Sequence, residues 1–216
     1  MMRQVARSQS LRSGNARFGG NASPAGSPYG FTVLELLFVL AITATMSSVA
    51  VPGVTHAVAR QRTVGAVRAL RGTFQRARAT AVARGANVAV RFTAGIDGIR
   101  YGLYLDGDRD GISSADIADG SDPPLDVMQS LSPFGGPEFG VWPGVVSPEG
   151  TALAADDPIR FGSSNLVSFS PAGSCTGGTA YIKGANGLQY AVRVYGDTGK
   201  TQVLRYVASQ RAWVGE

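Results

Sequence analysis

The sequence predicts an α+β fold in which one long N-terminal helix packs on an antiparallel, β-rich globular head. Three observations lead to this expectation. An uncharged apolar run continues into a stretch with helical periodicity, from residue 31 to about residue 84. Short runs of alternating apolar and polar residues fill the remainder. The 29 glycines indicate many turns, and therefore short strands rather than a helical bundle. A sheet packed on one side of the helix satisfies all three.

The first 30 residues differ in composition from the rest. They are rich in Ser, Gly, Asn, Arg and Pro, and this composition predicts disorder. They hold several arginines and no acid, so most of the net charge of +5 resides here. The remaining chain is nearly neutral, and its net charge gives no general case for nucleic-acid binding.

The apolar run begins at Phe31 and ends near Val54, and Glu35 is its only charged residue. About 24 residues at 1.5 Å each form roughly 36 Å of helix, which is long enough to cross a bilayer. The arginines upstream predict a cytoplasmic start by the positive-inside rule. A secretory signal has its small-residue cleavage site after the apolar core, whereas Gly30 precedes it here.

The string Gly30-Phe31-Thr32-Val33-Leu34-Glu35 resembles the type IV prepilin motif. That motif has a glycine, an aromatic or apolar residue after it, and a carboxylate as the fifth residue of the mature chain. The resemblance implies that residues 1–30 are a leader, that a prepilin peptidase cuts between Gly30 and Phe31, and that Phe31 is then N-methylated. A leader of this length is long for the family, which leaves the true start codon open.

Two residues of the apolar run have roles that the resemblance implies. Glu35 would guide assembly by pairing with the N-terminal amine of a neighbouring subunit. The alternative is an acid near the membrane interface, or one favoured in the first helical turn. Pro52 is expected to bend the helix, and a break followed by a restart is the alternative.

The helical period continues after Gly53 as one apolar stripe, which comprises Val54, Val58, Val64, Val67, Leu70, Phe74, Ala77 and Ala81. Arginines occupy the other faces, where they could be solvated, bind phosphates or contact other subunits. The helix is expected to end near Arg84-Gly85. The sequence thus predicts a helix over 31–85, with a transmembrane part over 31–54, and a β-rich head over 86–216.

Eight short segments of the head have strand character. They are Asn87–Thr93, Ile99–Leu105, Leu125–Ser130, Phe139–Val146, Leu166–Ser170, Thr179–Lys183, Leu188–Tyr195 and Thr201–Val207. Turn signals such as Asp97-Gly98 and Asn186-Gly187 separate them.

The segment Val167–Gly173, followed by Gly177-Gly178-Thr179, and the late hairpin of 191–207 add to the N-terminal motif. Together they resemble the GspH/FimT group of pseudopilins and minor pilins. The resemblance implies a pilin-like fold, a single-pass inner-membrane anchor with a periplasmic head, and assembly with other subunits. The filament would be a type II secretion pseudopilus or a type IV pilus.

Two rival interpretations remain open. Some FimT-like minor pilins bind DNA through a C-terminal Gly-Arg-x-Arg stretch, whereas this chain has Gly199-Lys200-Thr201-Gln202. One cation replaces two arginines, which weakens the case, yet Arg193, Lys200 and Arg205 remain candidate phosphate contacts. The other rival is an unprocessed single-pass membrane protein with a β-rich domain.

The segment from Asp106 to Gly111 matches the start of a Dx[DN]x[DN]G calcium loop. Its carboxylates, Asp106, Asp108 and Asp110, could converge on one calcium ion. The twelfth position has Ile117 instead of the usual glutamate, so an acidic, turn-rich surface loop is the alternative. No other cofactor is expected.

The sequence holds no recognisable catalytic constellation. His56 is the one histidine and Cys175 the one cysteine, so neither a metal-ligand cluster nor an internal disulfide can form from them. There is no Walker sequence and no G-x-S-x-G elbow. We therefore expect a structural protein rather than an enzyme.

Overall fold

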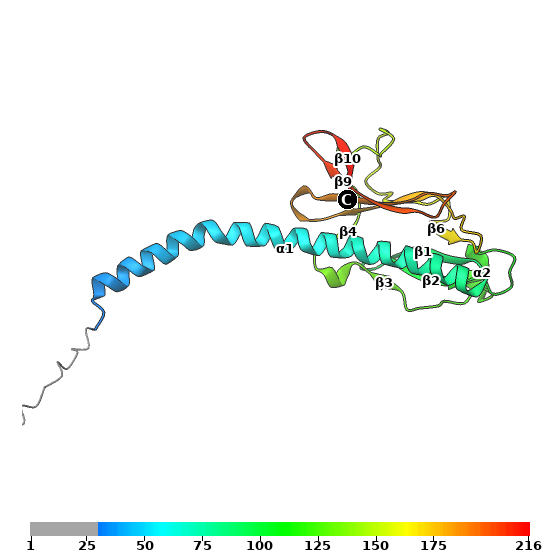
Figure 1. Ribbon diagram of the computed structural model, residues 1–216, viewed down its shortest axis with the longest axis horizontal. Coiled ribbons are helices and arrows are strands. Elements are labelled where there is room, and N and C mark those ends of the chain that lie inside the picture. Colours follow the sequence, from blue (N-terminus) through cyan, green and yellow to red (C-terminus); the bar gives the residue numbers. More distant parts are fainter. Residues whose placement is uncertain (1–29) are drawn as a thin grey trace, which may run out of the picture. The chain divides into compact units, whose positions relative to one another are not determined.

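The computed structural model describes residues 30–216, apart from the side chains of residues 49–52. The predicted disorder of residues 1–29 lies outside this range. The described chain forms two compact units, one up to Met46 and one over Ser47–Glu216. Helix α1 (Val33–Arg84) contributes to both units, which are considered separately below (Figure 1).

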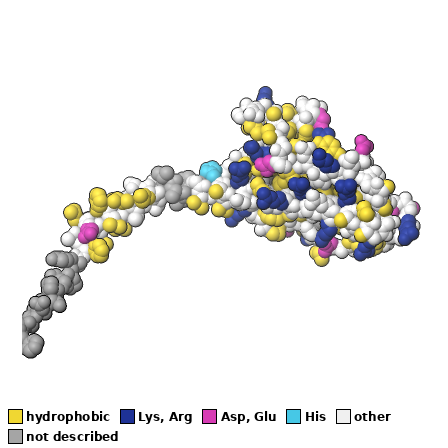
Figure 2. Space-filling model, in the orientation of Figure 1, with side chains coloured by type: hydrophobic (Ala, Val, Ile, Leu, Met, Phe, Trp, Pro, Cys, Tyr) yellow, Lys and Arg dark blue, Asp and Glu magenta, His cyan; other side chains and the backbone are white. Residues whose placement is uncertain are grey.

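The first unit is the beginning of α1. Thr32 caps the helix, because its Oγ1 accepts a hydrogen bond from the Glu35 backbone N–H at 3.1 Å and its carbonyl accepts one from Leu36 at 3.1 Å. Large apolar side chains follow on all sides of the helix and are exposed, with Leu34 at 78% and Phe38 at 68%. Figure 2 shows hydrophobic side chains along this part of α1. Within the described residues, α1 alone is long and apolar enough to cross a membrane, with a mean hydropathy of 2.0.

Helix α1 runs without interruption from Val33 to Arg84. The alternative of a break and restart at Pro52 is therefore wrong. The bend expected there stays a prediction, because the Pro52 side chain lies outside the described ones. The helix ends where the sequence predicts, since Gly85 follows in the left-handed conformation with φ at 61°.

The second unit contains two antiparallel sheets. The first has the order β3-β2-β1-β6 and comprises β1 (Val88–Gly95), β2 (Gly98–Leu105), β3 (Gln129–Ser130) and β6 (Leu166–Phe169). The second has the order β10-β9-β8-β7-β4, and β5 also pairs with β7. Its strands are β4 (Glu138–Phe139), β5 (Ile159–Arg160), β7 (Gly178–Lys183), β8 (Gln189–Val194), β9 (Thr201–Val207) and β10 (Ala212–Gly215). Helix α2 (Ser114–Asp119) and two 3₁₀ turns, Ser132–Phe134 and Ala185–Gly187, complete the head.

The main core lies between the second half of α1 and the two sheets. The predicted stripe is buried from Val67 to Ala81, whereas Val54 and Val58 are exposed. Phe74 is fully buried, and its ring packs on Phe161 at 5.8 Å and on Phe92 at 6.2 Å between centroids. A long helix packed on antiparallel sheets confirms the predicted α+β, pilin-like fold.

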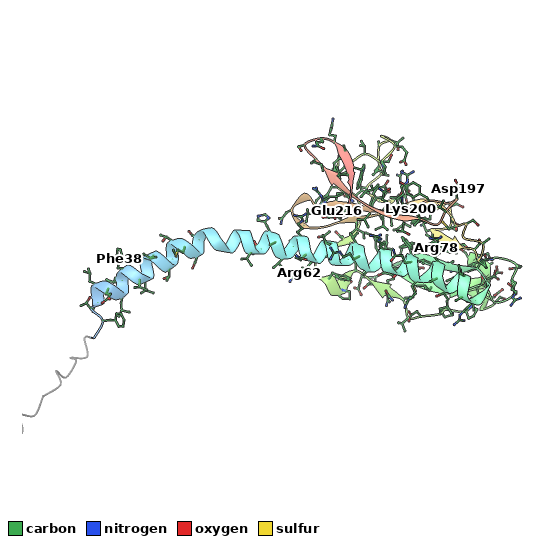
Figure 3. All side chains as sticks on the ribbon, in the orientation of Figure 1. Phe38, Arg62, Arg78, Asp197, Lys200 and Glu216 are labelled. Atoms are coloured by element: carbon green, nitrogen blue, oxygen red, sulfur yellow. The ribbon has the colours of Figure 1, made fainter. Side chains whose placement is uncertain are left out.

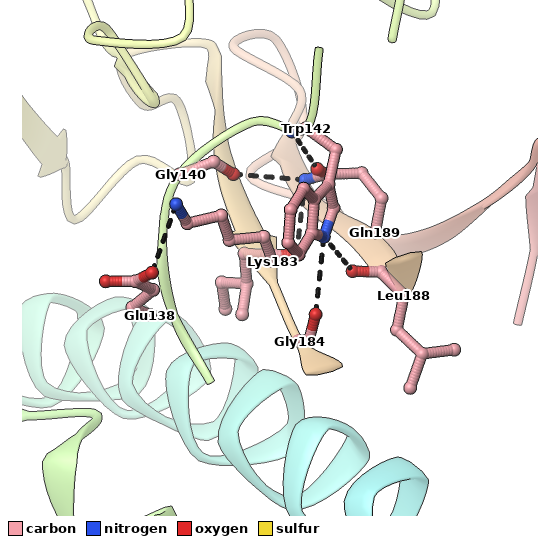
Figure 4. A network of polar contacts seen from close by, with 8 residues as sticks. Glu138, Gly140, Trp142, Lys183, Gly184, Leu188 and Gln189 are labelled. Carbon is pink, nitrogen blue, oxygen red and sulfur yellow. Dashed lines mark hydrogen bonds and ion pairs between the residues drawn. The ribbon is translucent and has the colours of Figure 1, made fainter. Parts of the chain in front are cut away.

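A smaller core covers the other face of the second sheet. Val141 and Val145 pack there on Tyr181, Ala191 and Leu204. Polar contacts hold this covering segment in place (Figure 4). Buried Gln189 accepts a hydrogen bond from the Trp142 backbone at 2.9 Å and donates to the Gly140 carbonyl at 3.1 Å. The Trp142 indole donates to the carbonyls of Gly184 and Leu188.

This covering segment corrects one predicted strand. Strand pairing stops at Phe139, and residues 140–146, which the sequence pattern assigned to a strand, lie across the sheet. Pro143 cannot donate a ladder hydrogen bond and Gly144 has a left-handed φ of 80°, so the alternation of apolar residues reflects packing without pairing. Similarly, the strand expected over Leu125–Ser130 is reduced to β3. Short elements β5, β10 and α2 were not predicted.

Candidate functional site

The predicted processing site is accessible. Gly30 and Phe31 precede the first helical residue, and the Phe31 side chain is 74% exposed. Apart from its chain neighbours, no atom of residues 30–216 lies within 4 Å of the point where a Cβ would stand on Gly30. A peptidase needs non-helical, uncovered backbone to bind, and this peptide bond offers both.

Glu35 lies in the first turn of α1, where the partial positive charge of the helix N-terminus favours an acid. Together with Thr32 it forms the sequence pattern of a capping box, of which the structure shows the Thr32 half. Among residues 30–216, no hydrogen-bond or ion-pair partner is found for its exposed carboxylate. The assembly role of Glu35 therefore stays a prediction. The alternative, an acid that is favoured simply by its place in the first helical turn, is also compatible with this position.

The acidic loop brings together a different set of carboxylates from the expected one. Asp106, Asp108 and Asp122 each place an oxygen within 4.8 Å of the others, and Asp110 is not part of this group. Asp110 instead lies beside Asp108, whose hydrogen bond and charge raise the pKa of Asp110. Asp122 was missed because it follows α2, far along the chain from the motif.

Protein donors already engage the two buried carboxylates of this group. Asp106 accepts from Asn87 Nδ2 at 2.6 Å and from the Arg109 backbone at 2.7 Å. Asp122 accepts from the backbones of Gly107 at 3.2 Å and Ser113 at 3.3 Å. These bonds shape the turn, and burial raises the pKa of Asp122. They fit the interpretation as a structured acidic loop, and calcium binding stays a prediction.

The three candidate DNA contacts are not brought together. Arg193 pairs with Gln202 across β8 and β9, and Arg205 pairs with Tyr190, three residues further along the ladder. Because side chains alternate between the two faces of a strand, the two arginines lie on opposite faces of the sheet. Arg193 is ion-paired with Glu149 and lies 5.1 Å from the Tyr195 ring centroid. Arg205 contacts Glu216 at 3.1 Å. Lys200 is exposed in the turn between the strands.

A polar pocket of about 340 Å³ lies on the outer face of the second sheet. Arg160, Thr179 and Arg193 form a row across β5, β7 and β8 along its floor. Tyr181 lies beside them, and burial raises its pKa to about 12, so its hydroxyl stays protonated. This pocket offers hydrogen bonds and no activated nucleophile.

The remaining reactive residue types show no catalytic arrangement in the described part of the chain. His56 is exposed on α1. Cys175 is half-buried, its Sγ lies 3.3 Å from the Tyr195 carbonyl, and burial raises the pKa of its thiol. A raised pKa lowers the thiolate fraction and with it the reactivity.

Comparison with known proteins places the chain in a family. The family profile of type II transport protein GspH matches residues 66–198. No curated protein and no solved structure gives a significant match. The matched region covers more than half of the chain, from the buried part of α1 through β8, including the loop-rich region 106–160. The chain therefore belongs to the GspH family of type II transport proteins.

Proposed function

We propose that this protein is made as a prepilin, cut after Gly30, and assembled through α1 into a type II secretion pseudopilus. At the level of its family the chain is a type II secretion pseudopilin, and such proteins are structural rather than enzymatic. The observation that carries the finer proposal is the first part of α1, whose apolar side chains are exposed and are preceded by an accessible glycine.

Exposed apolar surface of this extent needs a covering. Each buried Å² of apolar surface stabilises by about 25 cal/mol, so both a bilayer and the helices of neighbouring subunits are favourable environments. Before assembly the helix would span the inner membrane once, with the head in the periplasm. Afterwards the same side chains would pack against other subunits.

Glu35 would provide part of the driving force for assembly. An unpaired carboxylate costs about 2.5–3.5 kcal/mol at the centre of a membrane helix, and less near its end. The amine that cleavage creates on Phe31 of a neighbouring subunit would supply the missing partner. An acid that stays exposed to lipid headgroups would gain no free energy from assembly. The role of Glu35 in assembly is therefore distinct from the alternative role of an interfacial acid.

The rival functions have less support. Arg193 and Arg205 lie on opposite faces of one sheet, and each is paired with an acid. The two arginines therefore cannot contact the same stretch of DNA backbone together. The family description favours a secretion pseudopilus over a type IV pilus. An unprocessed membrane protein leaves the accessible Gly30–Phe31 bond without a role.

The acidic loop supports a separate proposal, that Asp106, Asp108 and Asp122 bind one calcium ion which stabilises the head. Three carboxylate oxygens within 4.8 Å match the oxygen ligands that calcium prefers. Calcium should then raise the unfolding temperature of the full chain, and should have no such effect on Asp108→Asn. An equal rise in both proteins would refute this site.

The central test is the mass and N-terminal sequence of the full chain co-expressed with a prepilin peptidase. The expected product begins at Phe31, is heavier by one methyl group, and is absent from Gly30→Arg. An uncut wild-type chain, alongside a known substrate that is cut, would refute the proposal.

A further inference from the structure

A second cavity, of about 130 Å³, lies between α1 and the second sheet. We refer to it as the α1–β9 cleft, and its lining includes Val64, Arg68, Arg71, Tyr190, Val203 and Glu216. Arg68 and Arg71 come from α1, Tyr190 from β8 and Val203 from β9. Figure 3 shows Glu216 near α1 on this side of the head.

Two buried polar atoms of the cleft have no hydrogen-bond partner among the described residues. They are the Tyr190 hydroxyl and Arg71 Nε. Tyr190 is fully buried, and burial raises the pKa of its phenol, so the hydroxyl remains a donor. Buried polar groups in proteins are nearly always paired, and two unpaired donors lining one cavity indicate that an acceptor binds there.

The charges around the cleft favour an anionic acceptor. Burial and the negative charge of Glu216 raise the pKa of the Tyr190 hydroxyl, whereas Arg60, which lies close to this hydroxyl, lowers it. Arg60, Arg68 and Arg71 have no ion-pair partner within residues 30–216. The carboxylate of Glu216 is engaged by Arg205 at 3.1 Å. Figure 2 shows Lys and Arg side chains spread over this face of the head.

We infer that the α1–β9 cleft binds the carboxylate of an Asp or Glu side chain from a neighbouring pseudopilin subunit. A carboxylate accepts several hydrogen bonds at once, so one group can pair with both Tyr190 and Arg71. The cavity of about 130 Å³ is several times larger than the volume of about 30 Å³ that one water molecule occupies, so it has room for a carboxylate group. A phosphodiester would bring two sugars against the valine walls, which makes nucleic acid the poorer fit. This inference rests on the proposed assembly into a filament.

The test uses a reaction that joins an amine directly to a carboxylate in contact with it. Arg68→Lys keeps the positive charge and places such an amine at the cleft. The full chain would be produced with the other pseudopilins, the filaments isolated and treated with a carbodiimide, and the joined peptides identified by mass spectrometry. Arg84→Lys, at the exposed end of α1 and outside the cleft, is the matched control.

The amine introduced by Arg68→Lys is expected to join an Asp or Glu of a neighbouring subunit, and the amine introduced by Arg84→Lys is not. Adding Tyr190→Phe or Arg71→Gln to Arg68→Lys should lower the yield of that link at least fivefold. The unfolding temperature of each variant shows whether the head remains folded, and Tyr190→Phe keeps the buried ring. Three results would overturn the inference: a link from the cleft amine to Glu216 of the same chain alone, no link at all, or an unchanged yield in both double variants.

The same samples report on the proposed function separately. An Arg68→Lys chain that begins at Phe31 and is present in the filaments, but forms no link from the introduced amine, leaves the function standing and refutes the cleft. A wild-type chain that is absent from the filaments refutes both. If inorganic phosphate stabilises the wild type but not Arg71→Gln, while filaments give no link, the site takes phosphate and the inference is wrong.

Discussion

The two ends of α1 belong to one helix but differ in what covers their apolar side chains. Between Val33 and Met46 these side chains are exposed, whereas between Ala66 and Ala81 they form a stripe buried under two sheets. Arginines fill the other faces of the second part, and the first part has no comparable polar face. The second part of the helix thus has the amphipathic pattern of a helix packed on a sheet, and the first part has the uniformly apolar pattern of a membrane helix.

The largest expected effect tests the buried end. Phe74→Ala removes a fully buried ring that packs on three other phenylalanines, and it should lower the free energy of unfolding by about 3–5 kcal/mol. Denaturant unfolding of the full chain in detergent measures this. Phe38→Ala, its counterpart at the exposed end, should leave the unfolding of the head unchanged. Equal losses in both variants would abolish the distinction between the two ends.

The next effect tests the exposed end. Ile42→Asp places a second charge within the apolar run and should disfavour membrane insertion by about 2.5–3.5 kcal/mol. The fraction of the chain recovered with membranes should fall sharply. Val82→Asp, at an exposed position of the other end, should not change that fraction. Undiminished membrane recovery of Ile42→Asp would show that this part of α1 is not the anchor.

A smaller effect concerns the helix start. Thr32→Ala removes the side-chain cap of α1 and should destabilise the first turn by about 1 kcal/mol. Amide hydrogen exchange at Glu35 should then accelerate by roughly five- to tenfold. Thr32→Ser keeps the hydroxyl and should exchange like the wild type. If both variants exchange alike, the Thr32 hydroxyl does not cap the helix.

The smallest effect concerns Asp122, a fully buried acid of the head. Burial raises the pKa of folded Asp122 above its ordinary value of 3.8, so the folded state retains the proton longer than the unfolded state does. This group therefore contributes stability below the ordinary pKa and loses it as the pH rises through the raised one.

Asp122→Asn should remove that decline, so the difference in unfolding free energy between wild type and variant should depend on pH across this window. Thermal unfolding in calcium-free buffers from about pH 3 to pH 7 measures the difference. Neighbouring Asp106 and Asp116 are common to both proteins. A constant difference would show that Asp122 does not titrate as inferred.

The comparison also explains what the sequence could and could not predict. The end of α1 and strands β1, β2, β6, β7, β8 and β9 follow local signals of period, turn and glycine, and the structure confirms them. Residues 140–146 look like a strand because Val141 and Val145 pack on the second sheet without pairing to it. β5, with two residues, is too short for a period to be recognised.

Contacts between distant residues account for the missed parts of the candidate sites. Asp122 joins Asp106 only because α2 returns the chain to the end of β2. Tyr190 and Arg71 look like ordinary core and surface residues in sequence, and their shared cavity exists only once α1 lies on the second sheet. Gly30, Phe31 and Glu35, by contrast, are adjacent in sequence and needed no fold to be found.

The cap at Thr32 has an electrostatic consequence for a cut chain. Only Phe31 and Thr32 would separate the new ammonium group from the first helical residue, so a positive charge would stand at the positive end of the α1 dipole. Methylation of the amine would not remove that charge. The mature subunit would thus begin with a repulsion that its own Glu35 in the first turn offsets only in part, and a carboxylate from another chain would offset the remainder. Cleavage would in this way create, at the N-terminus of α1, an electrostatic repulsion whose relief favours polymerisation.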